Sequence, residues 1–183
     1  MTHIHKHGGK SSESMLDKDA ILKKLKISAG QNIFDAGCGN GYMSKEFSKL
    51  AGTTGTIYAI DDHKHSIKKL KGQVEGTNIK VISGDITKKT EIDDSSIDLV
   101  YLSNVFHGFT PTQVRDFLLE IKRILKPNGI LAVLEINKDD TPFGPPVDIK
   151  YSPEELVKAV DLESETLTKI GEHFYMQTFV YKK

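Results

Sequence analysis

A glycine-rich turn is the segment best suited to hold a ligand. It reads Asp35-Ala36-Gly37-Cys38-Gly39-Asn40-Gly41 and follows a short apolar run. Glycines at alternate positions permit positive φ and let the backbone approach a ligand that a Cβ would push away. The dinucleotide fingerprint G-x-G-x-x-G would need its third glycine at Tyr42, so the spacing is one residue short. Because the Asp35 carboxylate repels a diphosphate and suits an ammonium group, the turn favours a cationic ligand.

The elements around this turn alternate between strands and helices. Apolar runs predict strands at 32–36, 56–60, 79–82, 97–102 and 130–136, followed by two terminal strands at 165–170 and 173–181. Helical spacing predicts helices at 17–26, 42–50, 66–74, 110–125 and 152–160, the last two opened by capping boxes at Thr110 and Ser152. This order predicts a Rossmann-like, doubly wound α/β fold with a seven-stranded sheet, parallel for its first five strands and closed by an antiparallel C-terminal pair.

Two connections differ from the rest. The segment Lys88–Ser96 is too polar for more than a short turn or helix, and Asn137–Tyr151 is a long proline-containing loop of the kind that usually has a function. In an open α/β sheet, ligands bind beyond the carboxyl ends of the strands where the strand order reverses. The glycine turn is expected at that point.

Composition narrows the class of protein. The 183 residues fit one domain, which we expect at 16–183, and 25 basic against 25 acidic residues give a net charge of zero. Such a balance lacks the positive field that nucleic-acid binding needs. The single cysteine, Cys38, excludes an internal disulfide and fits a cytoplasmic protein, and no apolar run reaches the roughly 18 residues of a membrane helix.

The sequence resembles a class I S-adenosylmethionine-dependent methyltransferase. The matching segments are Asp35–Gly41, Asp61, Ser83-Gly84-Asp85-Ile86, Ile97–Asn104 and Leu125–Leu131, in the order of that family's motifs. Within the family the chain is most similar to small quinone-biosynthesis-type and arsenite-type domains. The arsenite enzymes use several cysteines, and this chain has one.

The resemblance implies S-adenosylmethionine (SAM) as cofactor, S-adenosylhomocysteine as product, and a set of cofactor-binding residues. Asp35 would hold the methionine ammonium, Asp61 the ribose hydroxyls, and Asp85 the adenine amino group. The full implied set is Asp35, Gly37, Cys38, Gly39, Asn40, Gly41, Asp61, Asp62, Gly84, Asp85, Ile86 and Ser103. Structural alternatives remain for the three acids: bonds to loop amides for Asp35, a helix cap for Asp61 and a turn for Asp85.

The residues after the fourth predicted strand face donor and acceptor in this family. They read Ser103-Asn104-Val105-Phe106-His107 and lack the Asn/Asp-Pro-Pro-Tyr/Phe box of the enzymes that methylate amino groups of adenine or glutamine. His107 is the candidate general base, because a neutral imidazole is available near neutral pH. A histidine that only packs is the alternative, and a thiolate, an arsenical or an activated carbon needs no base. Asn104, Phe106, His107 and Tyr151 are the candidate acceptor-binding residues.

The function predicted from these features is methyl transfer to a small molecule by direct displacement at the sulfonium methyl. The alternatives are an NAD-dependent oxidoreductase on the same sheet and a non-catalytic SAM-binding module. We expect a monomer or homodimer without nucleic acid, membrane span or metal, with His107 bordering the acceptor cavity under segment 137–151. Residues 1–15 are expected to form a flexible, His-rich arm; it could fold over the cofactor as a lid, and alternating His3, His5 and His7 could bind a metal.

Overall fold

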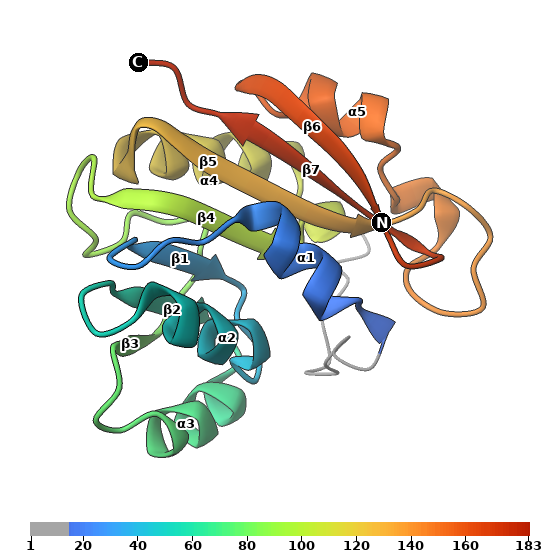
Figure 1. The fold of residues 1–183 in the computed structure, drawn as a ribbon. Coiled ribbons are helices and arrows are strands. Elements are labelled where there is room, and N and C mark those ends of the chain that lie inside the picture. Colours follow the sequence, from blue (N-terminus) through green and yellow to red (C-terminus); the bar gives the residue numbers. More distant parts are fainter. Residues whose placement is uncertain (1–14) are drawn as a thin grey trace.

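The computed structural model describes residues 15–183, in which strands and helices alternate along most of the chain (Figure 1). The elements are α1 Lys18–Leu25, β1 Ile33–Ala36, α2 Tyr42–Ala51, β2 Ile57–Asp61, α3 Lys64–Gln73, β3 Ile79–Ser83, β4 Ile97–Ser103, η2 Phe106–Gly108, α4 Pro111–Ile124, β5 Leu125–Ile136, η3 Val147–Ile149, α5 Pro153–Ala159, β6 Glu163–Ile170 and β7 Phe174–Val180. An arm is predicted at residues 1–15; residues 1–14 of it, which include His3, His5 and His7, lie outside the described range.

The strands form one seven-stranded sheet in the order β3-β2-β1-β4-β5-β7-β6. Strands β1 to β5 pair in parallel, and β7 pairs antiparallel with both β5 and β6. This confirms the predicted α/β sheet with its antiparallel C-terminal pair. The strand order reverses between β1 and β4, so the ligand crevice of this fold lies beyond the carboxyl ends of those strands.

Helices cover both faces of the sheet. Helices α1, α2 and α3 lie on one face, and α4 and α5 lie on the other (Figure 1). Side chains alternate between the two cores along each strand: Ile33 belongs to the core under α1–α3, and its neighbour Phe34 belongs to the core under α4 and α5. The central strands are therefore buried on both faces, as their continuous apolar sequences predict.

The predicted helix starts are confirmed in detail. The Thr110 hydroxyl accepts from the Gln113 amide at 3.3 Å, and the Gln113 side chain accepts from the Thr110 amide at 3.0 Å. Ser152 and Glu155 repeat the arrangement at α5. Each box satisfies amides that the first turn of a helix leaves without intrahelical partners, which fixes where the chain turns into α4 and α5.

Two predicted details are wrong. Strand β5 begins at Leu125 and not at Ile130, because Leu125 already pairs with Ile97 on β4. The residues that follow, Asn128 and Gly129, are hydrogen-bonded to Tyr181, just after β7. The pairing register shifts just after this first pair, which accommodates the extra residues as an irregularity in the strand. In α2, the helical spacing of the sequence predicts that Phe47 and Leu50 both face inward; Phe47 is fully buried, but Leu50 is 43% exposed.

Candidate functional site

The glycine turn links the end of β1 to the start of α2 and is built on positive φ angles. Gly37, Gly39 and Gly41 have φ of 72°, 54° and 72°. A Cβ at Gly37 would lie 2.9 Å from a Val105 methyl, and one at Gly41 would lie 2.6 Å from a methyl of buried Leu70, whereas a Cβ at Gly39 would meet nothing within 4 Å. Close packing therefore explains the outer two glycines, and the backbone is open beside the middle one.

The carboxylate of Asp61 ties this turn to the neighbouring strand. Asp61 ends β2, and its Oδ2 accepts from the Gly39 amide at 2.9 Å while its Oδ1 accepts from the His63 amide at 2.8 Å. Gly37 and Cys38 also donate their amides to the Ile60 carbonyl, at 2.8 and 3.0 Å. The turn and the tip of β2 thus form one hydrogen-bonded unit that presents a carboxylate. Asp62, the next residue, is exposed.

Asp35 is buried beneath the turn. It is 3% exposed, and its Oδ2 accepts from the hydroxyl of Ser44 on α2. The pKa of Asp35 is raised to about 7, chiefly by burial; the Ser44 hydrogen bond opposes this rise and the nearby Asp61 charge adds to it. Tyr101 lies opposite Asp35 in the β1–β4 register, and burial raises the pKa of its phenol as well. The site therefore holds a carboxyl group poised to change charge near neutral pH.

Cys38 has the properties of a packing residue. Its side chain is 8% exposed and belongs to the core under α1–α3. Burial, followed by the charges of Asp35 and Asp61, raises the pKa of the Cys38 thiol. A protonated, buried thiol is a poor nucleophile, so the structure supports the packing role over a chemical one.

The residues after β3 form the next part of the crevice edge. Gly84 donates its amide to the Asp61 carbonyl at 3.0 Å, which holds this turn beside the tip of β2. Asp85 is exposed and its Oδ1 accepts from the Thr87 amide at 2.8 Å and from the Thr87 hydroxyl at 2.7 Å. Ile86 is 7% exposed and belongs to the core on the α4 side. Of the three residues predicted here to bind the cofactor, Gly84, Asp85 and Ile86, one is therefore an accessible acid on a turn held by hydrogen bonds.

The segment after β4 begins with a constrained backbone. Asn104 has φ of 55°, and its amide donates to the Leu134 carbonyl at 2.8 Å, so the turn is attached to β5. Ser103, the last residue of β4, accepts a long hydrogen bond of 3.4 Å from the Asn104 side chain. These contacts place Ser103 and Asn104 beside the glycine turn, since β1 and β4 are paired.

His107 is not on an open surface, contrary to the expectation that it borders a cavity. Its side chain is 2% exposed, and its Nδ1 lies 2.6 Å from Oε2 of Glu135, a side chain that is 1% exposed. Phe106, expected at the acceptor site, is fully buried in the α4-side core and meets Tyr151 edge-on at 5.2 Å between ring centroids. Tyr151 in turn accepts, through its carbonyl, a 2.9 Å hydrogen bond from the Tyr175 hydroxyl.

Sequence reasoning missed part of this arrangement. Ser44 has no sequence signal beyond its place on the buried stripe of α2, and the pairing of Glu135 with His107 joins residues 28 positions apart. The usable signal for Glu135 is a lone acid in the apolar strand Ile130–Ile136. A charged residue in a strand covered on both faces needs a buried partner.

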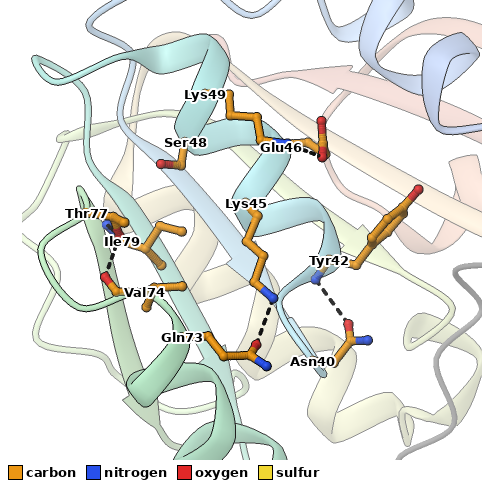
Figure 2. Close-up of a pocket in the computed structure, with 10 residues that line it drawn as sticks. All are labelled: Asn40, Tyr42, Lys45, Glu46, Ser48, Lys49, Gln73, Val74, Thr77 and Ile79. Atoms are coloured by element: carbon orange, nitrogen blue, oxygen red, sulfur yellow. Dashed lines mark hydrogen bonds and ion pairs between the residues drawn. The ribbon is translucent and has the colours of Figure 1, made fainter.

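A separate groove of about 430 Å³ lies between α2 and α3 (Figure 2). Its lining is Asn40, Tyr42, Lys45, Glu46, Ser48, Lys49, Gln73, Val74, Thr77 and Ile79. Lys45 reaches across it to donate to the Gln73 side chain at 2.8 Å, and Asn40 turns back to accept from the Tyr42 amide at 3.1 Å (Figure 2). The groove includes none of the acids Asp35, Asp61 and Asp85, so we assign the functional site to the strand ends and not to this groove.

No cluster of three or more His, Cys, Asp or Glu side chains suited to a metal ion occurs within residues 15–183. None of the helices in that range has the length and apolar character required to cross a bilayer.

The comparisons agree with this geometry. The family model described as "Methyltransferase domain" matches residues 34–133, more than half of the chain, so the chain belongs to the methyltransferase domain family. The match begins just before Asp35 and ends inside β5, and it therefore spans the crevice edge described above. The class is that of the SAM-dependent methyltransferases, and its cofactor is SAM.

Individual relatives place the chain more closely. It is 32% identical over 130 residues to a demethylmenaquinone methyltransferase from Lactobacillus johnsonii, covering 67% of this chain and 51% of that protein. A SAM-dependent methyltransferase from Aquifex aeolicus has the same fold, with a TM-score of 0.82, 24% identity and coverage of 93% and 92% of the two chains. An arsenic(III) SAM methyltransferase from Chlamydomonas reinhardtii gives a TM-score of 0.65 at 20% identity, with 86% and 65% covered. The chain spans about half the length of the curated relatives it matches.

The residues present fit this cofactor. The Asp61 carboxylate stands at the tip of β2, where the resemblance leads us to expect the ribose, and the backbone beside Gly39 is open. Asp35 supplies a buried acid for a cationic group, and Asp85 an accessible acid at the next strand tip.

Proposed function

We propose that this chain transfers the methyl group of SAM to a small-molecule acceptor by direct displacement. The observation that supports it best is the unit of glycine turn and Asp61, because it combines an open backbone with a carboxylate at the strand-order reversal. When bound, SAM supplies a methyl group already activated by its sulfonium. The contribution asked of the protein is alignment, which is worth as much as ~7–11 kcal/mol in favourable cases.

Each acid has a distinct task in this proposal. Asp61 accepts from the ribose hydroxyls, and Asp85 accepts from the adenine amino group, so both position the cofactor. Asp35 is buried, and a cationic ammonium beside it would favour its charged form, so it orients the methionine end. Ser44 holds the Asp35 carboxyl through its hydroxyl and thereby fixes the direction in which that acid points.

The acceptor is proposed to be a small ring compound of the quinol type. Support comes from the demethylmenaquinone methyltransferases among the relatives, and from the partly exposed ring of Tyr151, which meets the buried Phe106 edge-on. Flat aromatic surfaces favour a ring in contact with them. Asn104 and His107 both follow the end of β4 in the chain and are the polar residues that would orient its oxygen atoms.

Calorimetric titration with SAM and S-adenosylhomocysteine tests the cofactor. Wild type should bind both, and Asp61→Ala should bind much more weakly, while Asp93→Asn, at an exposed aspartate outside the predicted cofactor set, serves as the control that should bind like wild type. Titration with NADH tests the oxidoreductase alternative, and we expect no binding. Transfer of label from methyl-tritiated SAM to a quinol distinguishes an enzyme from a non-catalytic SAM-binding module. Absence of SAM binding by a folded wild-type protein would refute the proposal.

A further inference from the structure

A carboxylate and an imidazole are buried together at the carboxyl ends of β4 and β5. Glu135 and His107 are 1% and 2% exposed in their side chains, and Oε2 lies 2.6 Å from Nδ1. Glu135 is the second-last residue of β5, and His107 belongs to η2, four residues after the end of β4. Both therefore stand at the edge of the sheet where this fold binds its ligands.

The surroundings of this pair are apolar or aromatic. Phe106, adjacent to His107, belongs to the α4-side core, and Tyr175 stands opposite Glu135 in the β5–β7 register. Burying two ionisable groups in such a place costs desolvation free energy that apolar side chains of similar size would avoid. Fold stability alone therefore gives no reason for an acid and a histidine here, and ionisable groups buried beside a ligand crevice are candidates for function.

The hydrogen bond defines which ring nitrogen is basic. An ionised carboxylate only accepts, so His107 must donate from Nδ1, and a neutral ring then keeps its lone pair on Nε2. The other oxygen, Oε1, lies 3.4 Å from the His107 amide, so the two oxygens of Glu135 face the same residue. Glu135 thus fixes both the orientation and the tautomer of the ring.

The neighbouring Tyr175 does not compete with His107 for a hydrogen bond to the Glu135 carboxylate. The Tyr175 hydroxyl uses its proton in the 2.9 Å bond to the Tyr151 carbonyl and so does not donate to Glu135. Burial and then the Glu135 charge raise the pKa of both Tyr151 and Tyr175, which keeps these phenols neutral. Other charged groups near the tyrosines are Glu154, Glu155 and Lys138, of which Lys138 is bonded to Glu155 at 2.6 Å.

We propose that Glu135 is a positioning residue that holds His107 as the Nδ1–H tautomer, so that Nε2 takes the proton from a hydroxyl of the acceptor. This inference rests on the proposed function and narrows its acceptor to a compound that loses an O–H proton on methylation. The O–H proton moves to Nε2, the oxygen lone pair forms the bond to the methyl carbon, and the electron pair of the breaking carbon–sulfur bond stays on sulfur. The products are the methyl ether, the neutral thioether and an imidazolium on His107.

Access to Nε2 requires movement of the covering chain, because the ring is buried in this structure. Tyr151, the last residue of segment 137–151, meets Phe106 edge-on beside His107. That segment therefore borders the pair and is the part of the described chain whose displacement would let an acceptor in.

Nitrogen NMR of the free protein tests the tautomer without any cofactor. A long-range ¹H–¹⁵N correlation spectrum distinguishes Nδ1–H from Nε2–H rings, and loss of one ring system in His107→Gln assigns the signal. We expect wild-type His107 as the Nδ1–H form and Glu135→Gln in the Nε2–H form, because the new amide donates to Nδ1. Glu172→Gln is the matched control, since Glu172 lies 3.7 Å from the partly exposed His173 and its replacement should leave the His107 signals unchanged.

Kinetics test the use of the pair. With 1,4-dihydroxynaphthalene as acceptor, Glu135→Gln should lower kcat by about 10²-fold, the lower end of the effect of general base catalysis, with SAM affinity unchanged. The pH dependence of wild-type kcat should follow the titration of His107 measured by NMR. Label transfer to dithiothreitol, whose thiolate needs no base, should not exceed transfer to the naphthalene diol.

The outcomes separate the two proposals. A wild-type His107 in the Nε2–H form, or a Glu135→Gln protein of unchanged kcat and pH profile, would overturn this inference while leaving SAM binding intact. Failure to bind SAM would instead refute the proposed function. Should Glu135→Gln not fold, the wild-type spectrum decides alone, because a tautomer other than Nδ1–H is incompatible with the proposal.

Discussion

Replacement of Asp35 by Asn should change how stability depends on pH. Asp35 is 3% exposed, and its pKa is raised to about 7, chiefly by burial. Asn has nearly the same shape as the protonated acid and can still accept from the Ser44 hydroxyl. Asp35→Asn therefore mimics the neutral form at every pH, and its comparison with wild type isolates the cost of charging this one group.

The sign and size of this stability difference follow from the linkage between proton binding and folding. An unfolded Asp has a pKa near 3.9, so between about pH 4 and pH 7 the native state binds more protons than the unfolded state. The stabilising contribution of neutral Asp35 to the free energy of unfolding is thus fully present below about pH 4 and is lost as pH rises through about 7. A shift of about 3 pKa units corresponds to ~4 kcal/mol. Asp35→Asn should therefore match wild type near pH 4 and exceed its free energy of unfolding by ~4 kcal/mol at pH 8.

Urea unfolding at pH 4.5, 6, 7 and 8, followed by circular dichroism, measures this difference. Exposed Asp62→Asn is the control, and its curve should stay parallel to that of wild type. If Asp35→Asn also remains parallel to wild type across this range, burial does not hold Asp35 neutral and the reasoning fails. SAM should bind Asp35→Asn more weakly than wild type at pH 8, because the amide cannot carry the charge that an ammonium attracts.

Four further substitutions test the site, the glycine turn and the core. Asp61→Ala should weaken SAM binding by about 10- to 100-fold in calorimetry, the range for hydrogen bonds to a charged group. Gly41→Ala should cost ~2–4 kcal/mol in urea unfolding, because of its φ of 72° and the contact with Leu70, whereas Gly72→Ala, with nothing within 4 Å, should stabilise α3 by ~0.5–1 kcal/mol. Phe47→Ala should cost ~3–5 kcal/mol, since the ring is fully buried against Tyr101; an unfolding curve unchanged from wild type would contradict its core role.

Much of the fold was predictable because its signals are local. The capping boxes at Thr110 and Ser152 placed two helix starts, and the glycine turn with Asp61 placed the crevice. Each depends on residues a few positions apart, or on a motif whose backbone geometry fixes the residue type. The parallel arrangement of the first five strands followed from the alternation of strands and helices, which confines a sheet to few topologies.

The rest depends on contacts between distant residues. The partnership of His107 with Glu135 and that of Ser44 with Asp35 could be seen only once β4, β5 and α2 were placed. The early start of β5 at Leu125 also needed its partner Ile97, since Lys126-Pro127-Asn128-Gly129 looks like a turn by itself. Burial of His107 could not be predicted from its position in the motif, because motif position fixes the backbone and not what covers the side chain.

The connection between β3 and β4 contains no helix, and this affects how the molecule opens. Residues 84–96 cover the α4 side of β1, β2 and β3 with little more than the side chains of Ile86 and Ile92, and the Arg123 guanidinium holds the segment through the Ile92 carbonyl at 2.8 Å. Few apolar contacts and an edge position give low local stability. Amide protons of β3 should therefore exchange with solvent through a partial unfolding event that spares β4 and β5. The end of the crevice proposed to bind adenine would then unfold locally while the end proposed to bind the acceptor stays folded.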